Sequence, residues 1–222
     1  MLRSFHPLIL LGVLAWAPVA RAQNGPVEEG TFVIRIGDAE VGREHFVLQP
    51  GRRGGLPGST LRAEAAYPAV RPRTRITGVV ERTPGLVLAA AQFERAGADP
   101  LRIAAELARG RLTVRLAAPE RESAQEFPGG PDLVVLDDSL FSLWTAVADL
   151  ASESGTSLRY FKLQGGERGT LHAVRERVEG GGTRILLSGG ISGIILLDPD
   201  GRLQSLQIPA RQLEVLRTTE AQ

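Results

Sequence analysis

Hydrophobic and polar residues alternate over short runs along most of the chain. Phe32, Ile34 and Ile36, for example, would share one face of an extended segment, and Gly37-Asp38 follows as a turn. Alternation with a period of two, interrupted by glycine-rich turns, is typical of β-strands with one buried face. The pattern predicts about twelve strands, within residues 31–36, 41–48, 60–67, 73–82, 86–95, 101–109, 111–117, 157–163, 170–178, 183–188, 194–198, 203–208 and 213–217.

Two segments lack this alternation. Residues 49–59 carry four glycines and two prolines, and residues 120–131 are polar and end in Gly-Gly-Pro. Glycine and proline clusters of this kind favour turns and loops over regular structure. The sequence therefore predicts a long loop at each of these two places.

Helical spacing occurs in one region, residues 138–153. Leu140, Leu143, Trp144, Val147 and Ala151 recur at intervals of three and four residues, which places them on one helix face. Asp138 or Ser139 is predicted to cap the first turn, and Gly155 is predicted to end the helix. Strands on both sides of one amphipathic α-helix predict a mainly β fold, an antiparallel meander that curves into a half-barrel around the helix, with residues 23–222 as one domain.

Alanine is unusually frequent in the predicted strands, although bulkier residues normally pack better there. Small side chains on a concave face leave room for a covering helix or for a ligand. Two interpretations stay open: a helix that completes an ordinary core, and a ligand cavity beside the helix. The candidate ligand-binding residues are Phe141, Trp144 and Val147 of the helix with Ala90 and Ala104 of the strands.

The first 22 residues have the three parts of a secretory signal peptide. Arg3 precedes an apolar run from Leu8 to Val19, and Ala20-Arg21-Ala22 fits a cleavage site. The apolar run is shorter than the roughly 20 residues of a membrane-spanning helix, so an uncleaved anchor is the secondary interpretation. We expect a periplasmic or secreted protein without a transmembrane segment after cleavage.

Composition excludes several functions. The 222 residues include no cysteine, which rules out disulfides, thiolate zinc sites and a cysteine nucleophile. Removing Arg3 and Arg21 leaves 24 basic against 25 acidic side chains. The net charge is therefore close to zero, and it does not indicate nucleic acid as a partner.

Catalytic and metal-binding patterns are missing from the sequence. His45 and His172 have no ligand-like spacing, and the sequence around Ser192 departs from the Gly-x-Ser-x-Gly nucleophile motif. The Asp137-Asp138 pair precedes the helix, where capping explains it better than acid–base chemistry. The sequence therefore predicts no catalytic residues, no metal site, no cofactor and no enzymatic activity.

The stretch from Gly30 to Phe46 and the turn from Asp198 to Leu203 are the parts of the chain that look most like several uncharacterised periplasmic families. With the signal peptide and the helix-interrupted meander, the chain resembles bacterial periplasmic half-barrel proteins. Their familiar members are the lipoprotein-localisation carriers, and several uncharacterised envelope families share the pattern. The resemblance implies a binding site for acyl chains between sheet and helix.

Two functional hypotheses follow, and a hydrolase has no positive support. The first is a non-enzymatic protein that binds an apolar or amphipathic, lipid-like ligand between the curved sheet and the helix. The alternative is a structural or interaction module that binds an envelope protein and no small molecule.

Signal processing gives the first testable prediction. Cleavage after Ala22 would give an exported protein that begins at Gln23. Intact-mass measurement of the secreted or periplasmic protein checks this, and a full-length 222-residue chain in the soluble fraction would contradict it.

Overall fold

The computed structural model describes residues 28–53 and 56–218. The predicted signal peptide, residues 1–22, and the predicted mature start at Gln23 lie outside these residues. Within the described part of the chain, no helix is both long enough and apolar enough to span a membrane.

In the described part of the chain, fifteen strands form a single sheet, and the order of the strands across it is β8-β7-β6-β5-β4-β3-β2-β1-β15-β14-β13-β12-β11-β10-β9. The mainly β, largely antiparallel fold is confirmed, with fifteen strands where the sequence pattern predicted about twelve. The strands are β1 (Glu28–Ile36), β2 (Ala39–Arg53), β3 (Leu56–Tyr67), β4 (Thr74–Arg82), β5 (Leu88–Ala96), β6 (Leu101–Ala108), β7 (Arg111–Ala118), β8 (Arg121–Pro128), β9 (Leu133–Leu136), β10 (Thr156–Lys162), β11 (Arg168–Arg177), β12 (Thr183–Gly189), β13 (Gly193–Leu197), β14 (Leu203–Ile208) and β15 (Leu213–Thr218). Short 3-10 turns lie at Pro84–Leu86 (η1) and Pro209–Arg211 (η3).

Both predicted loops are wrong. Strands β2 and β3 continue through most of residues 49–59, and their backbones pair in register at Pro50 with Ser59 and at Gly51 with Gly58. The polar segment 120–131 contains β8, which pairs with β7 along its whole length. Pairing with a neighbouring strand overrides the local preference of glycine and polar residues for loops.

The helix is shorter than the predicted 138–153. A 3-10 turn, η2 (Phe141–Trp144), leads directly into α1 (Thr145–Leu150). Ser142 and Thr145 are buried although they are polar, because the sheet surrounds the helix on most sides. The helix connects β9 to β10, and these two strands pair in parallel. A crossover helix is the usual way to join adjacent parallel strands.

The predicted helix cap is also wrong. The first backbone N–H groups of the helical segment, those of Phe141 and Ser142, donate instead to the Glu44 carboxylate of β2, at 2.5 and 3.0 Å. Asp138 is exposed and pairs with Arg211 and Lys162, while Ser139 donates its backbone N–H to Asp137. The cap comes from a distant strand, which local spacing cannot predict.

Positive side chains lie at the other end of the helix. Arg175 of β11 donates to the Ala148 carbonyl at 2.5 Å, and Arg82 of β4 is 5% exposed and lies 3.7 Å from Asp149. Cations near a helix C-terminus stabilise it through the helix dipole. The Glu44 carboxyl group contacts the start of the helical segment, Arg175 contacts its last turn, and Arg82 lies beside Thr145 and Asp149.

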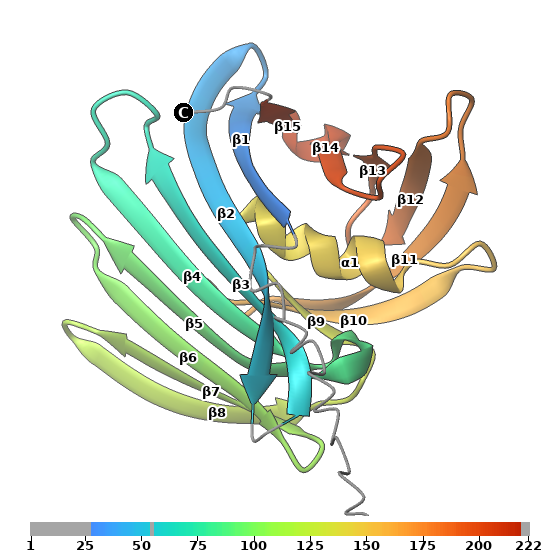
Figure 1. The fold of residues 1–222 in the computed structure, drawn as a ribbon. Coiled ribbons are helices and arrows are strands. Elements are labelled where there is room, and N and C mark those ends of the chain that lie inside the picture. Colours follow the sequence, from blue (N-terminus) through green and yellow to red (C-terminus); the bar gives the residue numbers. More distant parts are fainter. Residues whose placement is uncertain (1–27, 54–55, 219–222) are drawn as a thin grey trace, which may run out of the picture.

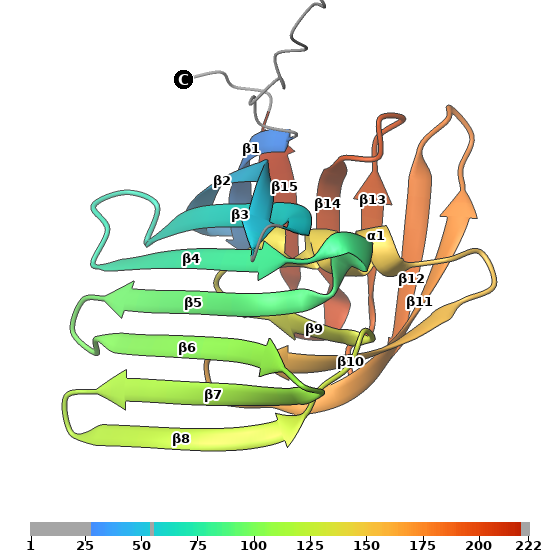
Figure 2. The same cartoon turned by 60° about the horizontal axis from the view of Figure 1, so that its bottom comes forward.

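The sheet curves round the helix (Figure 1). Its two ends then overlap as two layers: β5–β8 lie over β9 and β10 (Figure 2), and β5 contacts β9 directly. Between the layers, the rings of Phe127 in β8 and Phe161 in β10 lie 5.2 Å apart. Strand β9, residues Leu133–Leu136, is buried on both faces, because it lies between the β5 layer and the helical segment.

The space between helix and sheet is closely filled. Trp144 is 3% exposed and Val147 is fully buried. At Gly78 of β4, a Cβ atom would lie 2.5 Å from the Leu140 side chain, so any larger residue here would require Leu140 to move. Small residues on the inner face make room for the helix, as the excess of alanine suggested.

Replacing Trp144 tests this packing. Trp144→Ala should lower the free energy of unfolding by about 3 to 5 kcal/mol through lost burial and a residual cavity. A chemical unfolding curve measures the loss. Leu196→Ala, at a position 38% exposed on β13, serves as control and should cost far less. Equal midpoints for Trp144→Ala and wild type would show that the helix does not support the sheet.

Candidate functional site

The structure does not bring the five predicted ligand-binding residues together. Phe141, Trp144 and Val147 lie in the core around the helix, each at most 3% exposed. Ala90 pairs with Glu81 and Glu106, and Ala104 pairs with Gln92 and Arg115, all on the outer face of the sheet. The expectation that these alanines face the helix is therefore wrong.

A shift of one position explains the error. The inward-facing alanines of β5 and β6 are Ala91 and Ala105, which are 1% and 3% exposed. In a strand, consecutive side chains point to opposite faces, so adjacent alanines cannot be assigned to a face from composition. The search for a ligand site moves away from the helix.

Hollows occur where the two layers of the sheet separate. One, of 480 Å³, is lined by Leu112, Phe127 and Pro128 on one side and by β10 and the start of β11 on the other. A second, of 310 Å³, is lined by Val114, Leu116 and Leu163 among others. The two share Phe127, Phe161 and Gly166. We call this space, with its two hollows on either side of the Phe127–Phe161 contact, the interlayer cleft.

The cleft exists because the strands at its rim are not hydrogen-bonded to each other. Strand β8 ends the sheet on one side, and β9 ends it on the other. The layers are joined near the end of β8, where Arg159 forms a bidentate pair with Asp132 at 2.6 Å and donates to the Pro128 carbonyl. Beyond this junction the faces are held together by side chains alone.

Positive charge lies at the mouth of each hollow. The Arg168 guanidinium lies 4.6 Å from the centroid of the Phe127 ring, a cation–π contact. Arg121 lines the smaller hollow and is exposed. The nearby carboxylates are already paired, Asp132 with Arg159 and Glu167 with Lys162 at 2.7 Å. An apolar cleft with arginines at its rim is suited to an amphipathic molecule.

Sequence reasoning missed every residue of this cleft. Phe127 falls in a segment predicted as loop, because the inner positions of β8, Ser123 and Gln125, are polar. Edge strands that border an open space need no apolar inner face, so the period-two signal disappears. The uninterrupted apolar run of β9, Leu133–Leu136, was the signal that could have revealed a second layer.

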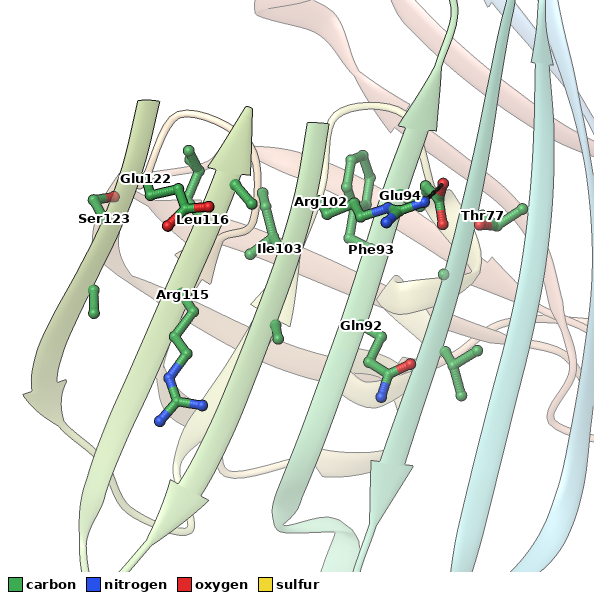
Figure 3. A pocket seen from close by; sticks show the side chains of 15 residues that line it. Thr77, Gln92, Phe93, Glu94, Arg102, Ile103, Arg115, Leu116, Glu122 and Ser123 are labelled. Carbon is green, nitrogen blue, oxygen red and sulfur yellow. Dashed lines mark hydrogen bonds and ion pairs between the residues drawn. The ribbon is translucent and has the colours of Figure 1, made fainter. Parts of the chain in front are cut away.

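The outer face carries a separate, open groove of 680 Å³ across β4–β8. Ala104, Ala117 and Ala124 form part of its floor. In Figure 3, Arg115 and Gln92 extend from β7 and β5, and Arg102 reaches Glu94, with which it pairs at 3.1 Å. Small and charged side chains alternate here, as on a solvated sheet face.

Buried acids gather at the N-terminal end of the helical segment. Burial raises the pKa of Glu44 to about 7, although its bonds to Phe141 and Ser142 oppose that rise. Burial also raises the pKa of Asp137, which accepts hydrogen bonds from Ser139 and Gln164. The arrangement joins the helix to the sheet and is closed to solvent, so we assign it an anchoring role.

Among the residues described, no three histidine or acidic side chains are grouped to hold a metal ion. His45 lies 3.6 Å from Glu29 on β1, and His172 is exposed on β11. Strands β1 and β12–β15 separate these two histidines in the sheet. Ser192 lies between β12 and β13, in a hairpin turn.

Comparison with known proteins gives structural similarity only. No family model matches the chain, and no curated protein matches it. A β-barrel-like protein of the domain of unknown function DUF1849 from Brucella abortus is similar over 87% of this chain and 97% of its own, with 10% identity and a TM-score of 0.49. A DUF1089 family protein from Pseudomonas aeruginosa is similar over 90% and 97%, with 15% identity and a TM-score of 0.40. These comparisons do not confirm the resemblance to lipoprotein-localisation carriers, which stays an expectation.

The anchoring role of Glu44 predicts a pH dependence of stability. Because the pKa of Glu44 is raised in the folded state, folding binds a proton between the unfolded value of 4.5 and about 7. Stability from this group is therefore present below about pH 4.5 and lost as the pH rises through 7, by on the order of 3 kcal/mol. Asp137 contributes in the same direction.

Glu44→Gln should reduce the loss of folding stability between pH 5 and 7, because glutamine accepts a hydrogen bond from a backbone N–H without carrying a charge. Urea unfolding at pH 5, 6, 7 and 8 measures the difference between variant and wild type. Glu64→Gln, at an exposed position on the outer face of β3, is the control and should follow the wild-type curve. A Glu44→Gln variant with the wild-type pH profile would contradict the assignment.

Proposed function

We propose that this protein is a non-enzymatic binding protein for an apolar or amphipathic, lipid-like ligand, and that the ligand occupies the interlayer cleft. The observation that carries the proposal is the pair of hollows on either side of Phe127 and Phe161, at the free edge of the sheet. This differs from the site expected from sequence, which lay between helix and sheet.

Size and lining support this site. Volumes of 480 and 310 Å³ fall in the range of small-molecule sites, about 300 to 1,000 Å³. Aliphatic and aromatic side chains from both layers line the cleft, among them Leu112, Val114, Phe161 and Leu163. Leu116 and Phe127 keep part of their apolar surface accessible, and covering that surface gives a driving force for binding.

The location of the rim favours ligand entry. Strand β8 has a free edge, and most of its residues are exposed. An edge strand held by one neighbour separates from the second layer at lower cost than a central strand, because fewer hydrogen bonds change. Together with the signal sequence, this supports a carrier or sensor of amphiphiles in the periplasm or outside the cell.

A neutral fluorescent probe tests the proposal. N-phenyl-1-naphthylamine should bind saturably, with increased emission in an apolar site. Gln125→Trp places a large ring over the smaller hollow, because Gln125 lies opposite Val114 on the inner face, and should weaken binding by about tenfold.

The adjacent residue provides a matched control. Ala124→Trp puts the same ring on the same strand but on the outer face, where Ala124 lies opposite Arg115, and should leave binding unchanged. Absence of probe binding, or equal effects of the two variants, would reject the cleft as the site. The alternative, an interaction module of the envelope without a small-molecule ligand, would then be favoured.

A further inference from the structure

The charges at the rim of the interlayer cleft specify the polar end of its ligand. We infer that the ligand is a single-chain amphiphile with an anionic headgroup, which pairs with Arg168 while the chain lies along Phe127 and Phe161. This inference rests on the proposed function, because it assigns the chemistry of the same site.

The position of Arg168 is fixed by its neighbours. Arg168 opens β11 directly opposite Phe161 of β10, and directly paired residues of antiparallel strands point to the same face. Its side chain therefore lies on the face of β10–β11 that is turned to β8. There the guanidinium lies over the Phe127 ring, 4.6 Å from the ring centroid.

Stacking leaves the hydrogen-bonding capacity of Arg168 available. A guanidinium that lies over a ring still presents its N–H donors at the edge of its plane, where a carboxylate, sulfate or phosphate accepts two of them. Within the described part of the chain, Arg168 has no carboxylate at ion-pair distance. Glu167, which precedes Arg168 in the chain, pairs with Lys162, and Asp132 pairs with Arg159.

The second hollow has the same polarity. Arg121 lies at its rim, on the inner-face side of β8, and the lining of this hollow includes no acidic side chain. The lining of the larger hollow includes Arg159 and Arg168 and likewise no acidic side chain. Positive groups without acidic lining favour an anion over a neutral or cationic headgroup.

Chain and headgroup are placed by one contact. The Phe127 ring contacts the Phe161 ring, and the Arg168 guanidinium lies over the Phe127 ring. Apolar and cationic surfaces therefore meet at Phe127. A headgroup at Arg168 brings the first carbons of its chain against Phe127. From there the apolar lining continues to Leu163 and Val114 in the smaller hollow.

Three amphiphiles of equal chain length distinguish the contribution of the headgroup to binding affinity from that of the chain. Isothermal titration calorimetry with decanoate and decyltrimethylammonium below their micelle concentrations, and with decan-1-ol below its solubility limit, compares an anion, a cation and a neutral molecule. Decanoate should bind about tenfold tighter than decan-1-ol, as expected for a charged hydrogen bond. Decyltrimethylammonium should bind weakest, and added salt should narrow the differences.

Variants assign the preference to Arg168. Arg168→Gln should reduce decanoate affinity to that of decan-1-ol and leave decan-1-ol affinity within about twofold, whereas Arg168→Lys should keep the anion preference. Arg115→Gln, at an exposed arginine of the outer groove, is the control and should keep wild-type binding of all three.

The outcomes distinguish the two claims. Equal affinities for the three amphiphiles in wild type, or an unchanged anion preference in Arg168→Gln, would overturn the headgroup assignment and leave the cleft as an apolar site. Loss of the preference in Arg115→Gln alone would place the anion on the outer face and overturn it as well. Failure of all three to bind would reject the proposed function itself.

Discussion

A helix enclosed by its own sheet has to satisfy its terminal backbone groups without water, and this constraint governs the molecule. Glu44 accepts the first N–H groups of the helical segment, and Arg175 donates to a carbonyl of its last turn. Each partner matches the sign of the helix dipole at its end. This arrangement buries the Glu44 carboxyl group, and burial raises its pKa to about 7. Without these partners the helix would have unpaired buried groups, and the strands that curve round it would lose their common core.

The helix also determines how the sheet ends. The helix is the crossover between two parallel strands, so it places β10 beside β9. Strand β9, the short edge strand, then lies beneath the layer formed by β5–β8 and contacts β5. Strand β9 can therefore be apolar at every position, while β8 on the opposite edge is mainly polar, with Phe127 as its large apolar residue on the inner face. The interlayer cleft follows from this overlap, because two layers that belong to one sheet separate where the inner layer stops.

Periodicity predicted the parts of the fold in which one face is buried and the other exposed. It identified the hairpin from Gly30 to Phe46, the strands β10–β15 and the apolar helix residues, because burial on one side leaves a period in the sequence. It failed for β8 and β9, where both faces share one environment and no period remains. The Glu44 cap and the orientation of Ala90 and Ala104 depend on partners distant in sequence. The cleft depends on the overlap of the two layers, which are distant in sequence. No local sequence pattern could therefore predict that Phe127 and Arg168 lie in contact.

Stability and binding occupy different parts of this protein for a physical reason. The helix and its surroundings are closely packed, since a Cβ atom at Gly78 would force the buried Leu140 side chain to move, and a ligand there would have to displace core side chains. Displacing even one buried aromatic residue costs about 3 to 5 kcal/mol, which offsets the gain from about four to six methylene groups at roughly 0.8 kcal/mol each. At the free edge, Phe127 is only partly buried and β8 is held by one neighbour, so a ligand gains apolar contact without disturbing the core. The same sheet is thus closely packed around the helix and more open at β8, the strand whose sequence lacks regular alternation of apolar and polar residues.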